Sequence, residues 1–332
     1  MSALEVRDVV VDYTRREGRI RAVAGASITV ESGQIVGLVG ESGCGKSTLA
    51  RAAVGLVKAT SGSVVFEGHE VAPLGRRARR RDLARLQIVF QNPYSSLNPR
   101  RKIGSQLADA LTTLGLVPAS GRTGRVRELC DLVGLPSGAV DRFPHEFSGG
   151  QRQRIAIART LAAEPSVIVL DEPLASLDAS AQAQIANLLV GLSRDLGLGL
   201  LLISHDLAIV RHVSDVVSVM YLGRMVETGA TRELWQEPLH PYTESLINAI
   251  PHPDGHGFLP AALPGEVPDP GRPPSGCRFH PRCPYAFDRC SAEEPPLVAL
   301  TGGRTAACWL QPAGADPGPL SERVKLVGRG GV

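Results

Sequence analysis

The chain has 332 residues, which is enough for about two domains and a substantial hydrophobic core. Its 36 Lys and Arg residues against 33 Asp and Glu leave a net charge of +3, too small for the basic footprint of a nucleic-acid-binding protein, so we expect no nucleic-acid partner. No apolar run approaches the roughly 18 residues that span a bilayer. Glu5, Arg7 and Asp8 interrupt the segment where a secretion signal would need a continuous apolar region, so we expect the chain to stay in a reducing cytosol.

The first 250 residues alternate short β-branched runs with helical stretches. The runs are Ile35–Val39, Gln87–Phe90, Val167–Leu170 and Leu200–Ile203. Such alternation is typical of a parallel α/β sheet. Within about 92–147 the strand signal disappears and apolar residues follow helical spacing, which predicts an α-helical insertion.

The composition changes near residue 250. Of the 25 prolines, 15 lie from Pro251 onward, together with four of the six cysteines. The apolar pieces of this region are too short and too few to form a core of its own without a further constraint. We therefore predict a main domain over 1–250 and a small Cys- and Pro-rich extension over 251–332.

A glycine-rich segment follows the first apolar run and precedes a predicted helix over 48–57. Its residues match the phosphate-loop pattern G-x-x-x-x-G-K-[ST]: Gly40, Glu41, Ser42, Gly43, Cys44, Gly45, Lys46, Ser47 and Thr48. The backbone N–H groups of such a loop and the N-terminus of the following helix face the phosphates. Lys46 would reach the β- and γ-phosphates, and Ser47 would supply a hydroxyl to Mg²⁺. Cys44 occupies a variable position of the pattern.

Two carboxylates follow the apolar run that ends at Leu170. They lie at the carboxyl end of a predicted strand, where open α/β sheets bind ligands. Asp171 is positioned to hold Mg²⁺, and Glu172 could deprotonate a water that attacks the γ-phosphate. A pair of helix-capping acids is the alternative, and the phosphate loop in the same chain argues against it.

A second glycine-containing segment, Phe147–Gln151, leads into a predicted helix and is a second potential anion site. With this segment the chain resembles the ATP-binding subunits of ABC transporters, whose signature is most often Leu-Ser-Gly-Gly-Gln, with Phe147 here replacing the leucine. The resemblance implies a P-loop NTPase fold of the ABC ATPase type: an α/β core with an antiparallel β edge, the helical insertion and the C-terminal extension. It also implies ATP and Mg²⁺ as ligands.

The resemblance assigns roles to further residues. The signature residues Ser148, Gly149, Gly150 and Gln151 would contact ATP that is held by the phosphate loop of a partner subunit. Gln91 would sense Mg²⁺, and His205 would act at the γ-phosphate. The family pattern also places Asp178 at the dimer interface and Tyr13 against adenine, although Tyr13 is assigned by position alone.

The resemblance implies partners as well. They are a second ABC ATPase subunit, identical or different, two integral-membrane permease subunits and, indirectly, an extracytoplasmic substrate-binding protein. ATP would close the ATPase dimer, hydrolysis would open it, and the helical insertion would pass the motion to the permease. The chain would then lie peripherally on the cytoplasmic face of the inner membrane.

The four C-terminal cysteines are Cys277, Cys283, Cys290 and Cys308. Zinc sites usually contain a ligand pair separated by two to four residues, which is missing here, and four cysteines also suit an iron–sulfur cluster. Together with His240–Thr243 and Leu263–Pro268, this tail resembles the C-terminal extension of oligopeptide and dipeptide importer ATPases, in which relatives hold a [4Fe–4S] cluster. A cluster, Zn²⁺ and no metal all remain open.

The sequence thus predicts an ATPase that powers the import of di- or oligopeptides. An importer ATPase for nickel or another small solute is the nearest alternative, because this subunit does not touch the cargo. A soluble ABC ATPase that acts on nucleic acid or ribosomes is the alternative from another class. The single phosphate loop, the near-neutral charge and the tail argue against it.

Overall fold

The computed structural model describes residues 2–15, 18–75, 80–250, 265–311 and 320. Its strands are β1 (Ser2–Arg15), β2 (Gly18–Glu31), β3 (Ile35–Val39), β4 (Ser61–Phe66), β5 (His69–Glu70), β6 (Leu86–Val89), β7 (Val167–Asp171), β8 (Gly199–Ile203), β9 (Val216–Tyr221), β10 (Arg224–Ala230), β11 (Val298–Ala299) and β12 (Thr305–Ala306). Its helices are α1 (Lys46–Ala53), α2 (Ile103–Leu114), α3 (Arg122–Leu132), α4 (Gly149–Leu161), α5 (Ala179–Leu196), α6 (Leu207–Val213), α7 (Thr231–Gln236), α8 (Pro241–Asn248) and α9 (Asp288–Ala292).

The larger sheet has the order β11-β12-β10-β9-β3-β8-β7-β6. Its central strands β9, β3, β8, β7 and β6 are parallel, which confirms the predicted α/β core. Its other edge is antiparallel, from β10 through β12 to β11. Neighbouring residues of β3 face opposite sides: Ile35 and Val39 join one core cluster, Val36 and Leu38 the other. Burial on both faces explains why these strands are continuous apolar runs.

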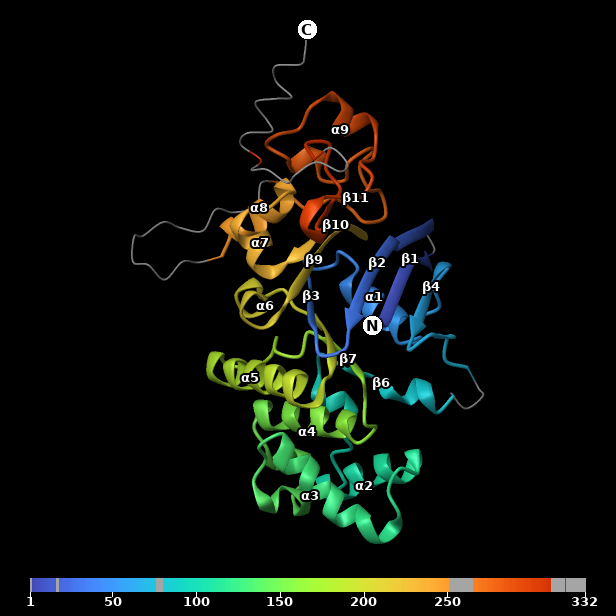
Figure 1. The fold of residues 1–332 in the computed structure, drawn as a ribbon, viewed down its shortest axis with the longest axis vertical. Coiled ribbons are helices and arrows are strands. Elements are labelled where there is room, and N and C mark those ends of the chain that lie inside the picture. Colours follow the sequence, from blue (N-terminus) through green and yellow to red (C-terminus); the bar gives the residue numbers. More distant parts are fainter. Residues whose placement is uncertain (1, 16–17, 76–79, 251–264, 312–319, 321–332) are drawn as a thin grey trace.

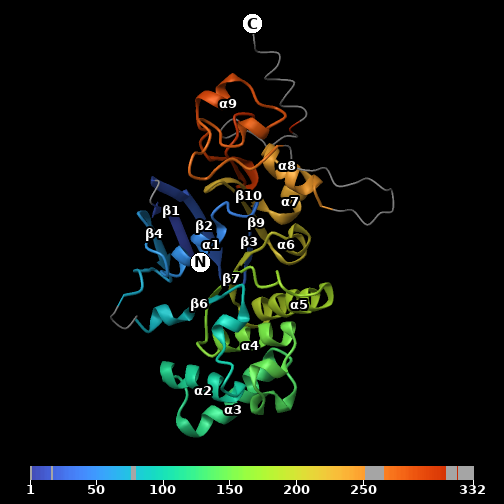
Figure 2. The same ribbon diagram turned by 180° about the vertical axis from the view of Figure 1, so that it is seen from behind.

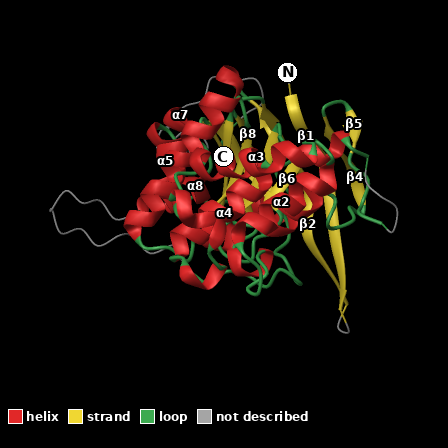
Figure 3. Ribbon diagram, turned by 90° about the horizontal axis from the view of Figure 1, so that it is seen from below, coloured by secondary structure: helices red, strands yellow, loops and turns green. Residues whose placement is uncertain are grey.

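A second, antiparallel sheet of order β2-β1-β4-β5 packs on one face of the larger sheet. Viewed along the long axis, most helices lie to one side of the strands of this smaller sheet (Figure 3). Helix α1 lies between the two sheets, because Leu49 and Ala53 share a core cluster with β1, β2 and β8. The smaller sheet therefore borders the loop that precedes α1.

The segment between β6 and β7 contains helices and turns, with no strand between Val89 and Val167, where every residue is described. Helices α2 and α3 form one end of the molecule and the C-terminal elements the other, as Figures 1 and 2 show. The described residues of the C-terminal region build no separate large core: β12 pairs with β10, and Phe279 joins the main cluster. Of the segment Leu263–Pro268, residues 263 and 264 lie outside the described part of the chain.

Along the described residues, no helix has both the length and the apolar character that a membrane crossing requires.

Candidate nucleotide site

The phosphate loop runs from the end of β3 to the start of α1, and two of its glycines are sterically required. Gly40 has φ 149° and Gly45 has φ 109°. A Cβ atom at Gly40 would lie 2.1 Å from the Met220 carbonyl oxygen, and one at Gly45 would lie 2.2 Å from the Ala22 carbonyl oxygen. Only glycine fits such positions. The loop is therefore held closely between β9 and β2.

Lys46 is the first residue of α1 and is buried. Its Nζ donates to the carbonyl oxygens of Gly40 at 2.7 Å and Glu41 at 2.9 Å. Two loop carbonyls thus hold the ammonium group of Lys46 against the loop, where it is predicted to contact the phosphates. The Cys44 side chain is buried in the core between the sheets, and burial raises the pKa of its thiol. Only the backbone of Cys44 therefore faces the phosphate site.

Of the three residues predicted to bind magnesium, Ser47, Gln91 and Asp171, the first and last are in contact. The Ser47 hydroxyl donates to Asp171 Oδ1 at 2.7 Å, and Arg51 Nη2 lies 3.8 Å from Asp171 Oδ2. Asp171 is the last residue of β7 and is buried. A hydroxyl and a carboxylate are the hard oxygen ligands that Mg²⁺ prefers, so these two residues fit that ion.

Three predicted catalytic residues meet at the carboxyl ends of neighbouring strands. Gln91 Nε2 donates to Glu172 Oε2 at 3.2 Å, and His205 Nδ1 lies 3.3 Å from the same oxygen. Gln91 follows β6, Glu172 follows β7 and His205 follows β8. Glu172 has φ 49°, a left-handed conformation that costs a glutamate about 1–2 kcal/mol. Such strain is typical of functional positions.

The signature segment forms the start of α4. Ser148 is its N-cap: the Gln151 N–H donates to Ser148 Oγ at 3.3 Å, and the Ser148 N–H donates to Gln151 Oε1 at 3.1 Å. This reciprocal pattern is a capping box. Gly149 and Gly150 pack near Leu177 and Ala181, at 3.2 and 3.1 Å from an added Cβ.

Two further predicted residues lie at the edges of the site. Asp178 caps α5 by accepting the Ala181 N–H at 2.9 Å, which places it beside the signature segment. Tyr13 is 39% exposed on β1 and pairs with Ile20 of β2, two residues from the contact of Ala22 with the phosphate loop. The structure therefore brings Tyr13 to the hairpin that borders the loop.

Two family models match the chain. That of the ABC transporter matches residues 23–175, and that of the oligopeptide/dipeptide transporter, C-terminal region, matches residues 226–290. A probable peptide ABC transporter ATP-binding protein of Sinorhizobium fredii is 49% identical over 298 residues, covering 89% of this chain and 84% of that protein. A Brucella ovis protein named for peptide import and ATP binding is 44% identical over 306 residues, covering 92% and 96%.

The chain belongs to the ATP-binding subunits of ABC transporters, in the oligopeptide and dipeptide class. The fold agrees. A dimeric ATP-binding cassette in a post-hydrolysis state with ADP and phosphate has a TM-score of 0.61 and 26% identity, covering 69% of this chain and 99% of that one. The cbiO1 protein of Clostridium perfringens, part of an ABC transporter complex, has a TM-score of 0.61 and 29% identity, covering 71% and 91%.

Membership fixes the general chemistry of the site. An ABC ATPase binds ATP with Mg²⁺ and couples its hydrolysis to transport, as the sequence predicted. Members of this class generally dimerise, work with permease subunits and associate with the membrane. The predicted roles of individual residues stay predictions. The contacts above add that Ser47 touches Asp171 and that Gln91 and His205 touch the same oxygen of Glu172.

The four C-terminal cysteines of this ABC ATPase line one cavity of about 20 Å³, with Phe279 and Trp309 among its other walls. Burial raises the pKa of the Cys277, Cys283 and Cys308 thiols, which disfavours thiolates unless a cation stabilises them. Within the described ranges, no three His, Cys, Asp or Glu side chains form a group that could hold a metal ion. The structure therefore gathers the predicted ligands without arranging them around an ion.

Sequence reasoning missed the groups that hold the phosphate loop from the C-terminal side. Tyr242 and Arg282 both contact Glu41, a position that the phosphate-loop pattern leaves unspecified. They lie 201 and 241 residues away in the sequence, so no local pattern could indicate them. A carboxylate inside a loop built for polyanions was the available signal, because such a charge needs a partner.

Proposed function

We propose that this chain is the ATP-hydrolysing subunit of an ABC importer for di- or oligopeptides, with an ATPase domain over 1–250 and an extension over 251–332. The observation that carries the proposal is the convergence of Gln91 and His205 on Glu172, beside the Ser47–Asp171 contact. The match of residues 226–290 to the oligopeptide/dipeptide transporter region supports the peptide class, as do the peptide-related names of the relatives.

In this proposal the phosphate loop binds the phosphates of ATP through its backbone N–H groups, and Lys46 contacts the β- and γ-phosphates. Ser47 and Asp171 hold Mg²⁺, which offsets negative charge on the phosphates. Glu172 accepts a proton from water as the water oxygen attacks the γ-phosphorus. The bond to the β–γ bridging oxygen breaks, and ADP and phosphate leave. Gln91 and His205 orient the Glu172 carboxylate through the contacts they make with it.

We further propose that two ATPase subunits, alike or unlike, close over two ATP molecules. Ser148, Gly149, Gly150 and Gln151 of one subunit, together with Asp178, contact the nucleotide side of the other, and Tyr13 stacks on adenine. The capping box supports this, because it fixes the N-terminus of α4 and so prepares an anion-binding helix end. Such a dimer would lie on the cytoplasmic face of the inner membrane and be served indirectly by an extracytoplasmic binding protein.

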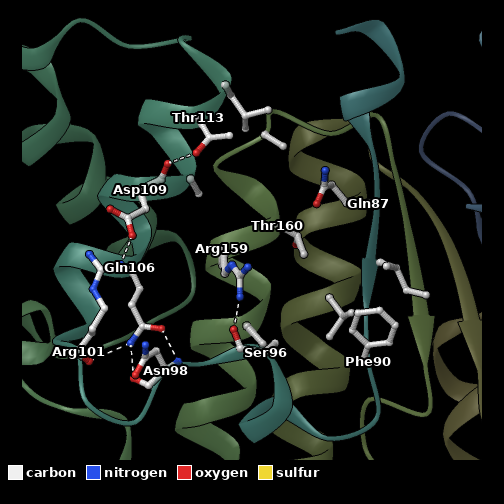
Figure 4. Close-up of a pocket in the computed structure, with 16 residues that line it drawn as sticks. Gln87, Phe90, Ser96, Asn98, Arg101, Gln106, Asp109, Thr113, Arg159 and Thr160 are labelled. Carbon is white, nitrogen blue, oxygen red and sulfur yellow. Dashed lines mark hydrogen bonds and ion pairs between the residues drawn. The ribbon is translucent and has the colours of Figure 1, made fainter. Parts of the chain in front are cut away.

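A groove of about 540 Å³ between β6, α2 and α4 supports a permease contact (Figure 4). Its lining includes Phe90, Asp109 and Arg159, and Phe90 directly precedes Gln91. A cytoplasmic loop of the permease that packs against Phe90 would therefore act one residue from a group that touches Glu172. This is a short physical route from the nucleotide to the membrane partner.

Glu172→Gln tests the catalytic assignment. The amide cannot accept the proton, so we expect the rate of ATP hydrolysis to fall by about 10²–10⁴-fold while ATP still binds. The variant should also accumulate as a closed dimer with ATP, measured by size-exclusion chromatography. Glu70→Gln, the same change at an exposed residue of β5, is the matched control. Retention of hydrolysis near the rate of the unmodified protein would remove Glu172 from the role of base.

We propose that the four cysteines hold a metal group, with a [4Fe–4S] cluster as the first choice and Zn²⁺ as the alternative. Their convergence on one cavity supports this. The test is to purify the protein without oxygen and quantify iron, acid-labile sulfide and zinc per chain. About four irons and four sulfides indicate the cluster. One zinc indicates a structural zinc site, and protein without either metal overturns the proposal. Cys290→Ser should lower the metal content. Cys130→Ser should not, because Cys130 is buried in α3 and does not line this cavity.

A further inference from the structure

The segment that carries the four cysteines, residues 277–308, is called the C-terminal element below. One of its side chains contacts the phosphate loop directly. Arg282 lies in a short turn, His280–Arg282, that directly precedes Cys283. Its Nη1 donates to Glu41 Oε2 at 2.7 Å and its Nη2 donates to Glu41 Oε1 at 3.0 Å. The Arg282 side chain is 3% exposed and that of Glu41 is 18% exposed. This is a bidentate, largely desolvated pair, the strongest form of a side-chain ion pair.

The pair acts on a residue whose backbone is also fixed. The Glu41 N–H donates to the Tyr242 hydroxyl at 2.8 Å, and the Glu41 carbonyl oxygen accepts from Lys46 Nζ at 2.9 Å. Side chain, N–H and carbonyl of Glu41 are therefore all engaged. A shift of the Glu41 side chain would move the carbonyl that positions the ammonium group of Lys46.

A cluster of buried aromatic rings supports the contact between Arg282 and Glu41. Tyr221, Tyr242 and Phe279 are buried and pack together, with ring centroids 4.6–5.3 Å apart. The Arg282 guanidinium lies 5.8 Å from the ring centroids of Tyr221 and Phe279, within the range of cation–π attraction. Because this cluster joins α8, β9 and the C-terminal element, it holds Arg282 in place against the loop.

A second set of contacts links the same element to Cys44, in the middle of the loop. Arg278 Nη1 donates to the Leu222 carbonyl oxygen. The next residue, Gly223, donates its N–H to the Cys44 carbonyl oxygen at 2.7 Å. The C-terminal element thus contacts the loop directly at Glu41 and, through the turn between β9 and β10, indirectly at Cys44.

The ion pair between Glu41 and Arg282 affects how the phosphate loop binds an anionic ligand. A carboxylate in a loop that binds a polyanion repels its ligand, and in a partly desolvated site this repulsion is strong. Arg282 neutralises that charge and fixes its direction. We propose that Arg282 is a positioning residue through which the C-terminal element sets the affinity of the phosphate loop for ATP. This inference rests on the proposed function, because it assumes that the loop binds ATP.

The test is the ATP dissociation constant of the full chain, measured by calorimetry, together with kcat and KM. Without Arg282 the Glu41 carboxylate stays uncompensated beside the phosphates, and a tenfold loss of affinity corresponds to a repulsion of only about 1.4 kcal/mol, so Arg282→Met should raise Kd and KM about tenfold. The value of kcat at saturating ATP should stay within about twofold, because Glu172, Gln91 and His205 are untouched. An unchanged Kd, or a loss of kcat alone, would overturn the proposal.

A double variant separates the pair from a general loss of structure. Glu41→Gln/Arg282→Met removes the uncompensated carboxylate, so it should bind ATP more tightly than Arg282→Met does. Additive losses in the double variant would refute the coupling. If Arg282→Met does not fold, Arg282→Lys keeps the charge but loses the bidentate geometry, and it should raise Kd about threefold. Under that condition an unchanged Kd for Arg282→Lys rejects the proposal.

Arg289→Met is the matched control within the same element. Arg289 is exposed, pairs with Glu293 and stacks on Trp309, so its loss should leave the Kd for ATP unchanged. An equal rise in Kd for Arg289→Met would count against a specific role for Arg282. If the unmodified protein fails to bind ATP, the proposed function fails. If it binds and Arg282→Met binds equally well, only this inference fails.

Discussion

His240 lies at the N-cap of α8 and is 2% exposed. Its Nδ1 accepts the Tyr242 N–H at 3.0 Å, and its ring packs 5.9 Å from that of Phe279. Burial lowers the pKa of His240 to about 3, because the charged imidazolium would lose its water. The folded protein therefore keeps this ring neutral above about pH 3.

This titration makes the stability depend on pH. Below pH 6.5 the His240 imidazole of the unfolded chain binds a proton, whereas that of the folded chain stays neutral down to about pH 3. Acid therefore favours unfolding between pH 6.5 and about pH 3. The His240 contribution should lower the free energy of unfolding by up to about 1.4 kcal/mol for each pH unit below 6.5. Urea unfolding at pH 7.5, 6.0 and 5.0 measures it.

His240→Asn is the informative variant, because asparagine keeps a capping acceptor but does not titrate. Its stability should fall less steeply with acid than that of the unmodified protein. His212→Asn, at an exposed position of α6, is the matched control and should keep the original pH slope. Equal slopes for all three proteins would mean that His240 is not the titrating group.

Among the elements, those of the phosphate site were the most predictable. The strand that ends at Val39, the loop and a following helix follow from one pattern whose glycines, lysine and serine each have a steric or chemical reason. The helix was predicted over 48–57 and runs instead from Lys46 to Ala53. β7 extends one residue beyond the predicted run, to include Asp171. The capping box at α4 was not predicted, although Ser148 and Gln151 have the S-x-x-Q spacing that indicates one.

Other elements could not be predicted from local patterns. The close approach of β2 to Gly45 depends on how the two sheets pack together. The sequence of neither sheet indicates that packing. The same holds for β12, whose two residues become a strand by pairing with β10. The cluster and zinc alternatives both required the four cysteines to lie together, but their arrangement depends on a turn and a helix that lie among prolines and glycines.

At the scale of the whole molecule, one buried ion pair joins the C-terminal region to the larger sheet. Arg304 Nη2 donates to Glu227 Oε1 at 2.9 Å, with side chains 3% and 0% exposed. Glu227 also accepts the N–H groups of Leu239 and His240 at 3.0 and 2.9 Å. One carboxylate thus connects β10, the start of α8 and the segment before β12.

Arg304→Met would leave the Glu227 carboxylate buried without a cation. Breaking a buried pair in this way costs about 3–5 kcal/mol, so we expect the free energy of unfolding in urea to fall by that amount. Glu227→Gln/Arg304→Met removes both charges and should be less destabilised than Arg304→Met. Arg194→Met, which breaks the exposed pair with Asp195, should leave stability unchanged. If Arg304→Met and Arg194→Met unfold alike, the buried pair does not hold the region together.

The contact between Glu41 and Arg282 also constrains the order in which the protein can mature during synthesis. The two residues are 241 positions apart. At a ribosomal rate of 5–20 residues per second, Glu41 leaves the peptidyl transferase centre roughly 10–50 s before its partner. During that interval the strands and helices of the first domain can form, while the carboxylate in the loop has no cation from the C-terminal element. The newly made subunit would thus reach its full affinity for nucleotide only after Arg282 has been synthesised and has paired with Glu41.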